Sequence, residues 1–265
     1  MSVQLEALAD EVFGAAAAQA RLGSQSVRRS FGEAIWNPTY PDLFFLNGIG
    51  DLVAPGWTVD DFEAAVRETI PGVRAFRAYS RDPETIASLG PALVAAGYAH
   101  DRRIAMVQVQ PDHDSPSPGS GRGFVIHPVD TSARWADYER LIHADTTEHG
   151  WTPAMREQLI KLYRWRVDQT PTRFFLAYVA DQAVGHVGLF QHGTSAYLHA
   201  LFTDPARRRR GAGSILTLSM QGEATAMGCE RLTLQCSDDG YLPGYYRRLG
   251  FRAVGEQHHW TKPRR

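Results

Sequence analysis

The sequence has 265 residues, of which 43% are hydrophobic and 22% are charged, and its formal net charge is −1 at pH 7. This composition predicts one large globular domain or two ordinary ones, and the near-neutral charge gives no reason to expect binding to nucleic acid or to a membrane. Two cysteines, Cys229 and Cys236, provide neither a disulfide framework nor a metal-binding spacing. No apolar run approaches the roughly 20 residues of a membrane span, so we expect a cytoplasmic protein. We also expect no bound metal.

The first 111 residues read as a small α/β domain. An alanine-rich helix is predicted over residues 2–22, and Thr58 or Asp60 is a suitable N-cap for a second helix that ends near Pro71. The other elements predicted here are strands at 31–35, 43–49, 73–79 and 103–110 and a helical stretch at 85–96.

A linker is predicted at 112–122, where the chain consists mostly of Pro, Ser, Gly and Asp. The second domain then covers residues 123–265 and has a loop rich in His and acidic residues at 143–153. Its predicted strands lie at 124–128, 173–180, 183–191, 195–203, 231–237 and 251–260, and its helices at 133–142, 155–168, 214–227 and 241–249. This alternation is typical of an α/β fold with a mixed sheet.

The most informative stretch runs from Leu201 to Ser214. An apolar strand stops at Pro205, four arginines and two glycines follow, and an apolar-periodic helix begins. The first amides of a helix lack intrahelical acceptors and carry partial positive charge, and glycine lets a ligand approach the backbone. We therefore predict a phosphate-binding turn, although a solvated basic face and a nucleic-acid patch are alternatives.

The turn Arg208-Arg209-Arg210-Gly211-Ala212-Gly213 resembles the pyrophosphate loop, Arg/Gln-x-x-Gly-x-Gly/Ala, of the GNAT family of acyl-CoA-dependent N-acetyltransferases. The preceding Leu201-Phe202-Thr203-Asp204-Pro205 resembles the end of the family's adjoining strand, with Thr in place of Val. Downstream, Tyr246-Arg247-Arg248-Leu249-Gly250-Phe251 resembles the family's Tyr-x-x-x-Gly-Phe. The resemblance covers residues 123–260 and implies the GNAT fold, with a mixed and largely antiparallel central sheet.

Residues 93–98, followed by a predicted strand, are similar to residues 246–251, which a strand also follows. The N-terminal domain at 1–111 therefore reads as a degenerate, partial GNAT-like copy that lacks the glycine turn and should not bind a cofactor. An unrelated small α/β domain is the alternative.

The family resemblance implies a binding site for acetyl-CoA. In the family, the turn holds the CoA pyrophosphate through backbone amides, the preceding strand pairs with pantetheine, and the tyrosine often protonates the departing thiolate, whose pKa is roughly 8.5 when free. For Tyr246, a core tyrosine is the alternative. Asp239 stands where the family often has an Asn that touches CoA. The cofactor-binding residues implied are Leu201, Phe202, Thr203, Arg208, Arg209, Arg210, Gly211, Ala212, Gly213, Ser214, Asp239 and Tyr246.

His199 is the candidate general base, because histidine titrates near neutrality. Strand alternation places it on one face with Tyr197, Leu201 and Thr203; the alternative is a buried core histidine. The loop at 143–153 lines the acceptor pocket in the family, although here it could also be a solvated polar loop. The residues expected to bind the acceptor are His143, Asp145, Glu148, Trp151 and Tyr197.

The predicted function is transfer of an acetyl group from acetyl-CoA to a primary amine, directly in a ternary complex, because no cysteine nucleophile accompanies the motifs. The alternative is a non-catalytic acyl-CoA binding or sensing module. The acceptor, whether a small amine, an amino acid, an antibiotic or a protein amine, stays open, as does the choice between monomer and homodimer.

Overall fold

The computed structural model describes residues 3–72, 75–109 and 123–262, so the predicted linker at 112–122 lies outside the described residues. The helices are α1 Val3–Arg21, α2 Val59–Thr69, α3 Pro83–Ser88, α4 Gly90–Ala95, α5 Ser132–Glu148, α6 Pro153–Gln169, α7 Ala212–Ala226 and α8 Leu242–Arg248, with short 3-10 helices η1 Phe44–Leu46 and η2 Pro205–Arg207. The strands are β1 Gln25–Arg29, β2 Gly32–Trp36, β3 Gly48–Gly50, β4 Phe76–Ser80, β5 Ala99–Val109, β6 Phe124–Pro128, β7 Thr172–Val179, β8 Gln182–His192, β9 Ser195–Thr203, β10 Arg231–Ser237 and β11 Arg252–Lys262.

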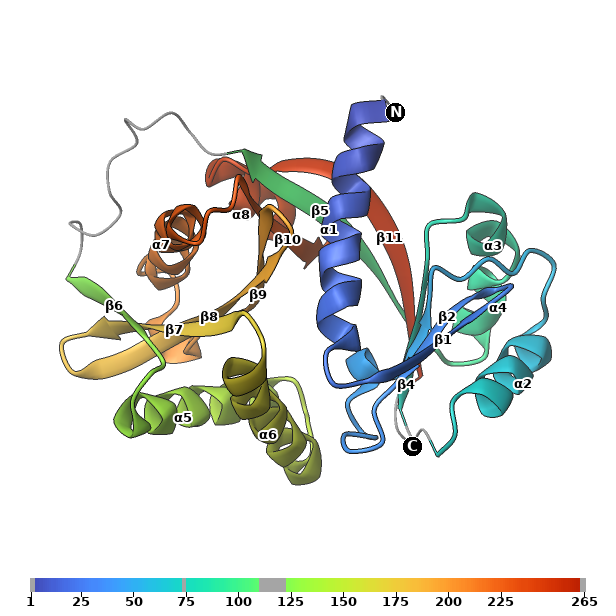
Figure 1. Cartoon of the computed structure of the whole chain (residues 1–265), viewed down its shortest axis with the longest axis horizontal. Coiled ribbons are helices and arrows are strands. Elements are labelled where there is room, and N and C mark those ends of the chain that lie inside the picture. The colour runs from blue at the N-terminus through green and yellow to red at the C-terminus, as the bar shows by residue number, and fades with distance from the viewer. Residues whose placement is uncertain (1–2, 73–74, 110–122, 263–265) are drawn as a thin grey trace.

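Within these residues the strands form one 11-stranded sheet in the order β1-β2-β3-β4-β11-β5-β10-β9-β8-β7-β6 (Figure 1). Two neighbouring pairs, β3–β4 and β9–β10, are parallel, and the other described pairs are antiparallel. The predicted α/β class with a mixed, largely antiparallel sheet is therefore confirmed.

The two halves of the chain exchange strands at the centre of the sheet. Strand β5 comes from the first half but pairs with β10, whereas the C-terminal strand β11 pairs with β4 of the first half. The two strands also pair with each other over nine register positions from Arg252–Val107 to Thr261–Ala99. On one side of this central pair, β4 is antiparallel to β11 and parallel to β3. On the other side, β10 is antiparallel to β5 and parallel to β9. The two sides therefore repeat the same order, as a partial internal copy would.

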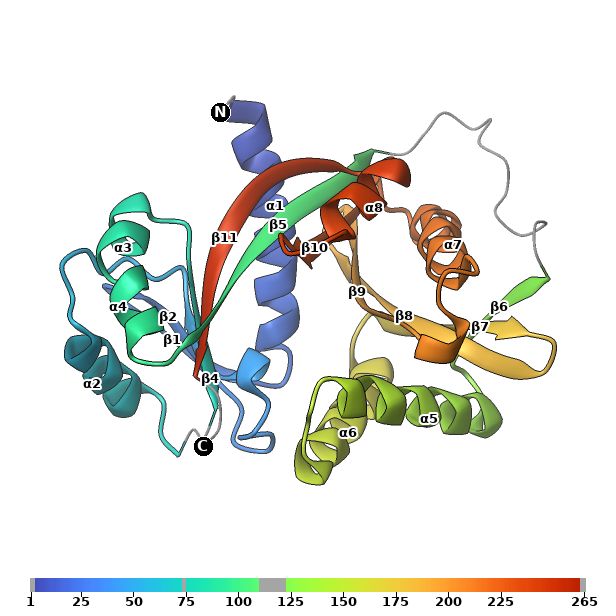
Figure 2. The same cartoon turned by 180° about the vertical axis from the view of Figure 1, so that it is seen from behind.

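Helices cover both faces of the sheet (Figure 2). Helix α1 packs Val12 and Phe13 against Ala105, Val107 and Val254 of the central strands. On the opposite face the residues of α7 and α8 share a core with alternate residues of the same strands; it includes Met106, Leu198, Leu216, Leu234, Cys236, Tyr246 and Phe251. Helices α5 and α6 pack against η1 and against the residues of β7 that face the same side of the sheet as α1. Helices α1, α5 and α6 therefore lie on one face.

Two expected elements, one in each half of the chain, need correction. The predicted strand at 43–49 is divided into η1 and β3, because Asn47 Nδ2 donates to the carbonyls of Tyr40 (3.1 Å) and Leu43 (2.8 Å) and holds a turn. The region expected as final strands, 251–260, is the single strand β11, interrupted by a bulge between Ala253 and Gly255. Both differences arise from contacts that residue patterns alone do not specify.

Candidate functional site

The parallel pairing of β9 with β10 stops before either strand ends. Register pairs run from Ser195–Arg231 to Leu198–Leu234, yet β9 continues to Thr203 and β10 to Ser237. Beyond Leu198 the β10-facing backbone groups of β9 therefore have no ladder partner in the described sheet. Such an edge can pair with an extended ligand through main-chain hydrogen bonds.

A β-bulge lies at this opening. The register between β8 and β9 shifts between His186 and Gly188, and Ala200 has a φ of 50°. A bulge sets two residues against one and so reverses the alternation of faces beyond it.

The expectation that Tyr197, His199, Leu201 and Thr203 share a face is therefore wrong. Tyr197 packs in the α1-side cluster, whereas Leu201 packs against the α7-side core. Thr203 also faces α7, because its Oγ1 would lie 3.5 Å from a Cβ added at Gly213.

The Arg- and Gly-rich turn has the conformation that the sequence predicts. Gly211 is the N-cap of α7 with a φ of 98°, which suits glycine, and no side chain caps the helix. The amides of Ala212, Gly213 and Ser214 occupy the first three helical positions and thus lack intrahelical acceptors. Arg209, with a φ of 62°, helps to fold the turn back toward β9. These amides are unpaired donors beside the open edge, the kind of group that binds anions at helix N-termini.

The four arginines differ in their partners. Arg208 forms a bidentate ion pair with Glu148, including Nη1 to Oε1 at 2.8 Å, and its Nε donates to the Thr203 carbonyl at 3.1 Å. Arg207 donates to Gln182 Oε1 at 2.6 Å. In the described part of the chain, Arg209 and Arg210 are exposed and have no side-chain partner. These two guanidinium groups are therefore available to bind a diphosphate.

Helix α5 is longer than predicted, and this changes the setting of three expected acceptor residues. It continues through Glu148, so His143, Asp145 and Glu148 lie on its last turns and not in a loop. No Gly or Pro interrupts the helix before Gly150, and the His149 amide donates to the Asp145 carbonyl at 3.1 Å. The true connection to α6 is therefore only four residues long.

The ends of these side chains are already engaged. His143 Nδ1 accepts from Arg156 Nη1 at 3.1 Å, and Asp145 pairs with His149 at 3.0 Å. Burial raises the pKa of Asp145, while the ion pair with Arg208 lowers the pKa of Glu148.

Trp151, in the short connection, packs against two aromatic rings of the other half of the chain. Its centroid lies 5.9 Å from that of Phe44 and 6.3 Å from that of Phe45. Among the predicted acceptor residues, Trp151 therefore lies where the two halves of the chain meet.

His199 lies in an aromatic environment at the bulge. Its ring stacks on Tyr197 with a centroid distance of 6.2 Å and contacts Phe174 at 5.6 Å. Burial lowers the pKa of His199 to about 3, and the positive charge of Arg166 acts in the same direction. The histidine is thus neutral at pH 7, contrary to the expected titration near neutrality. Its Nε2 is buried and accepts no hydrogen bond from the described residues.

The two tyrosines of α8 point to different parts of the site. Tyr246 is 5% exposed and belongs to the cluster that contains Leu198 and Cys236, both at the point where β9 and β10 separate. Burial raises the pKa of Tyr246, so the phenol stays protonated. Tyr245, which the motif spacing passes over, has its hydroxyl 3.1 Å from the position of a Cβ at Gly213. Its proximity to the turn depends on the packing of α8 against α7, which the sequence does not reveal.

The remaining features add no second site. Asp239 is exposed in the connection before α8, and its amide donates to Ser237 Oγ at 3.3 Å. No group of three or more His, Cys, Asp or Glu side chains within residues 3–72, 75–109 and 123–262 is arranged to hold a metal ion. No helix in the described part of the chain is long and apolar enough to cross a membrane.

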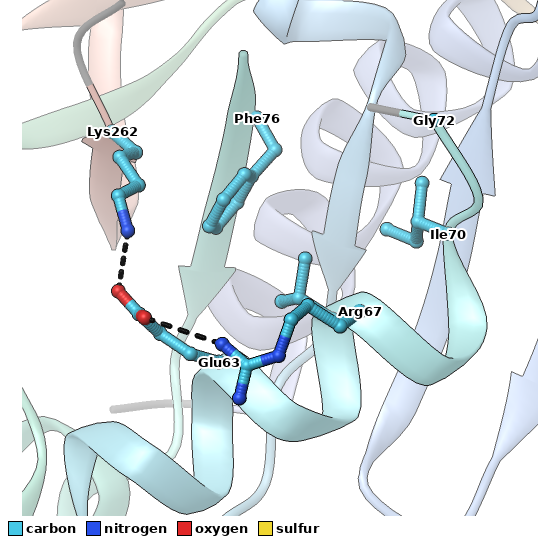
Figure 3. Close-up of a pocket in the computed structure, with 7 residues that line it drawn as sticks. Glu63, Arg67, Ile70, Gly72, Phe76 and Lys262 are labelled. Atoms are coloured by element: carbon cyan, nitrogen blue, oxygen red, sulfur yellow. Dashed lines mark hydrogen bonds and ion pairs between the residues drawn. The ribbon is translucent and has the colours of Figure 1, made fainter. Parts of the chain in front are cut away.

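A pocket of about 190 Å³ opens between α2, β4 and the end of β11, and none of the predicted site residues lines it (Figure 3). The carboxylate of Glu63 there meets Arg67 at 3.5 Å, Lys262 Nζ, and the Tyr98 hydroxyl at 2.9 Å. Because both cations of the pocket, Arg67 and Lys262, are already paired with Glu63, we assign this pocket no role. Its lining residues are Glu63, Val66, Arg67, Ile70, Gly72, Phe76 and Lys262.

Comparison with known protein families finds a match over part of the chain. Residues 135–251 match the model of the acetyltransferase (GNAT) family. No curated protein sequence matches the chain.

Several solved structures share the fold at low sequence identity. A functionally unknown conserved protein from Staphylococcus epidermidis ATCC 12228 is 12% identical with a TM-score of 0.70, over 91% of this chain and 95% of that one. A GCN5-related N-acetyltransferase from Kribbella flavida is 17% identical with a TM-score of 0.62, over 96% and 95%. Another from Sphaerobacter thermophilus is 16% identical with a TM-score of 0.58, over 90% and 75%. The similarity to the first two extends over both halves of the chain.

Proposed function

From the match of residues 135–251 to the acetyltransferase (GNAT) family model, we propose that the protein transfers an acetyl group from acetyl-CoA to a primary amine. The observation that carries the proposal is the continuity of two surfaces. The unpaired edge of β9 beyond Leu198 leads directly into the uncapped amides of α7. This order suits a ligand with a diphosphate at one end and an extended amide chain at the other.

Acetyl-CoA has these two chemical features. Its diphosphate would accept hydrogen bonds from the amides of Ala212, Gly213 and Ser214, and Arg209 and Arg210 would add charge. Its pantetheine amides would pair with the backbone of β9 between His199 and Thr203. This arrangement brings the thioester to the bulge, beside Tyr246 and His199.

Transfer then requires two proton movements. The amine nitrogen bonds to the thioester carbon, a tetrahedral oxyanion forms, and the C–S bond breaks to release a thiolate. The amine loses a proton in the process, and we assign its acceptance to His199 Nε2, directly or through water, while the Tyr246 hydroxyl protonates the thiolate. Burial raises the pKa of Tyr246, so the phenol holds its proton until the thiolate forms beside it.

Direct transfer to the amine is favoured over an acyl-enzyme intermediate. Cys236 is the cysteine nearest to the opening, but it is 4% exposed, and burial raises its pKa to about 11. The thiolate is the nucleophilic form of cysteine, so this residue is unreactive at neutral pH.

The test is amine-dependent release of CoA thiol from acetyl-CoA, measured with a panel of primary amines. We expect at least one amine to increase thiol release well above the rate of hydrolysis without amine. Tight binding of acetyl-CoA without release by any amine would contradict the proposal and would indicate an acyl-CoA binding or sensing module.

A further inference from the structure

Polar side chains gather at the centre of the sheet, on the face that α1 covers, where β4, β11, β5 and β10 lie side by side (Figure 1). The registers align them: His259 is paired with both Tyr79 and Asp101, and Gln257 with Arg103. Because alternate residues of a strand share a face, Arg77 joins this set through Tyr79. The central polar cluster consists of Arg77, Tyr79, Asp101, Arg103, Gln257 and His259.

The cluster contains two guanidinium groups but one carboxylate. Arg103 forms an ion pair with Asp101, and the other oxygen of Asp101 accepts from Ser237 Oγ at 2.7 Å. His259 is neutral because burial lowers its pKa well below the usual range. The net charge of the cluster is therefore +1.

Arg77 carries the uncompensated charge. Its Nε donates weakly to Thr261 Oγ1 at 3.4 Å, and its guanidinium lies 4.6 Å from the centroid of the Phe44 ring. In the described part of the chain no carboxylate lies within ion-pair distance of it. Burial lowers the pKa of Arg77 to about 10, with a further contribution from the charge of Arg103. A half-buried cation without an ion-pair partner is a position where an anion can bind favourably.

The cluster is partly accessible to solvent. The side chains of Arg103 and Asp101 are 31% and 29% exposed, and Arg77 is half-buried. Arg77 is therefore partly accessible and strongly desolvated. A small ligand could reach it and exclude the remaining solvent.

The cluster also adjoins the proposed reaction site. Tyr197 is close enough to Arg77 and Arg103 for both charges to act on its pKa, and its ring stacks on His199. On the same side, Phe44 lies under Arg77 and contacts Trp151, one of the predicted acceptor residues. A continuous path of polar and aromatic groups thus leads from Arg77 to the bulge.

We propose that Arg77 binds a carboxylate of the acceptor, so that the acceptor is a small amine that also carries a carboxylate, such as an amino acid. The inference rests on the acetyltransferase function proposed above. One carboxylate would bring the cluster to neutrality, whereas a phosphate monoester, with a charge of about −1.5 to −2, would leave an excess of negative charge. The planar guanidinium matches a carboxylate with two parallel hydrogen bonds.

The first experiment compares substrates on the wild-type protein. α-Amino acids and ω-amino acids of increasing length are each assayed beside their primary amides, with O-phosphoethanolamine as the phosphate counterpart, by release of CoA thiol. We expect the best acid to exceed its amide by about 10- to 100-fold in kcat/KM, the usual value of a charge-assisted hydrogen bond. Equal rates for acids and amides would overturn the carboxylate inference but leave the acetyltransferase in place, and a preference for O-phosphoethanolamine would identify a phosphate site. Release by no amine at all would overturn the proposed function and the inference with it.

The second experiment replaces Arg77 by Met. We expect a loss of about 10- to 100-fold in kcat/KM for the best acid, mainly through KM, with little change for its amide. Because Arg77 is half-buried and has no ion-pair partner in the described part of the chain, the melting temperature should change little. The matched control is Arg28→Met, whose side chain is 68% exposed. Equal losses on acid and amide, or a lowered melting temperature, would make Arg77 a structural residue; if the variant does not fold, the comparison of acids with amides on the wild type still decides.

Discussion

Burial sets the protonation of the side chains nearest to the opening between β9 and β10. It keeps the Tyr246 phenol protonated and the His199 imidazole neutral, because a charged form would lose its hydration there. The two groups thus begin in the states that a proton donor and a proton acceptor need, although neither titrates near pH 7. The site therefore works through placement and not through a pKa close to neutrality.

Replacing Tyr246 by Phe tests the proton donor. We expect turnover to fall by roughly 10²- to 10⁴-fold, the usual contribution of a general acid, while affinity for acetyl-CoA and the melting temperature change little. Steady-state release of CoA thiol and calorimetric binding measure the two effects separately. Tyr245→Phe, one residue away at the phosphate turn, is the control and should affect binding more than turnover. Full activity in Tyr246→Phe would remove this tyrosine from the mechanism.

The buried histidines predict how stability depends on pH. His186 is fully buried, and desolvation lowers its pKa, like that of His199, to about 3. Unfolding restores a pKa near 6.5, so below that pH the unfolded chain binds protons that the native protein does not. Their stabilising contribution is complete above about pH 6.5 and is lost as the pH falls toward the native value.

Chemical unfolding between pH 7.5 and 5 measures this effect. We expect the free energy of unfolding to fall with decreasing pH below 6.5, by at most about 1.4 kcal/mol per pH unit for each buried histidine. In His186→Phe, which retains an aromatic ring next to Tyr138 and Phe202, the slope should be smaller. An unchanged slope in this variant would show that His186 does not contribute.

The bulge and the phosphate turn act together at the level of elements. The bulge at Ala200 turns Leu201 and Thr203 toward α7, where Thr203 meets the first turn of that helix. The open edge and the helix amides consequently form one surface. The proposed acyl-CoA would use both, because the reversal of faces occurs between them.

Replacing Gly213 by Glu tests this surface. The backbone can accept the change, because an acidic residue in the first turn of a helix is favourable and a Cβ there meets only the flexible Tyr245 side chain and the Thr203 hydroxyl. The added carboxylate would nevertheless repel the diphosphate, and we expect acetyl-CoA affinity to fall at least about tenfold without unfolding. Gly222→Glu, on the same helix with open space around it, should bind normally. Unchanged calorimetric affinity in a folded Gly213→Glu protein would contradict the pyrophosphate assignment.

At the scale of the whole molecule, the exchange of β5 and β11 makes the two halves interdependent. Strand β5 lies between β10 and β11, so a fragment that begins at residue 123 loses the central strand of its own sheet. Unpaired strand edges and an exposed core favour aggregation. The division into domains at 1–111 and 123–265, which remains a prediction, therefore need not correspond to independent folding.

Expression of the two fragments tests this interdependence. We expect 123–265 alone to be unfolded or insoluble, and co-expression with 1–111 to restore a soluble complex that binds acetyl-CoA. Circular dichroism and gel filtration distinguish the two cases. A stable, cooperatively melting 123–265 fragment would show instead that the second half folds without β5.

The sequence by itself determined the features that depend on neighbouring residues. The strand, the Arg- and Gly-rich turn and helix α7 follow one another within a short stretch, and Gly211 marks the left-handed cap that this turn requires. Most of the elements and the family resemblance follow from the same local signals, although the edge strand β1 was not predicted.

Only the tertiary structure decided which distant residues meet. The bulge at Ala200 depends on the register with β8, and the neutrality of His199 depends on its aromatic neighbours. The lone positive charge of Arg77 became evident once β4 had joined β11, a strand from the other end of the chain. Face, burial and charge compensation are properties of contacts between segments far apart in the chain, and residue spacing carries no record of them.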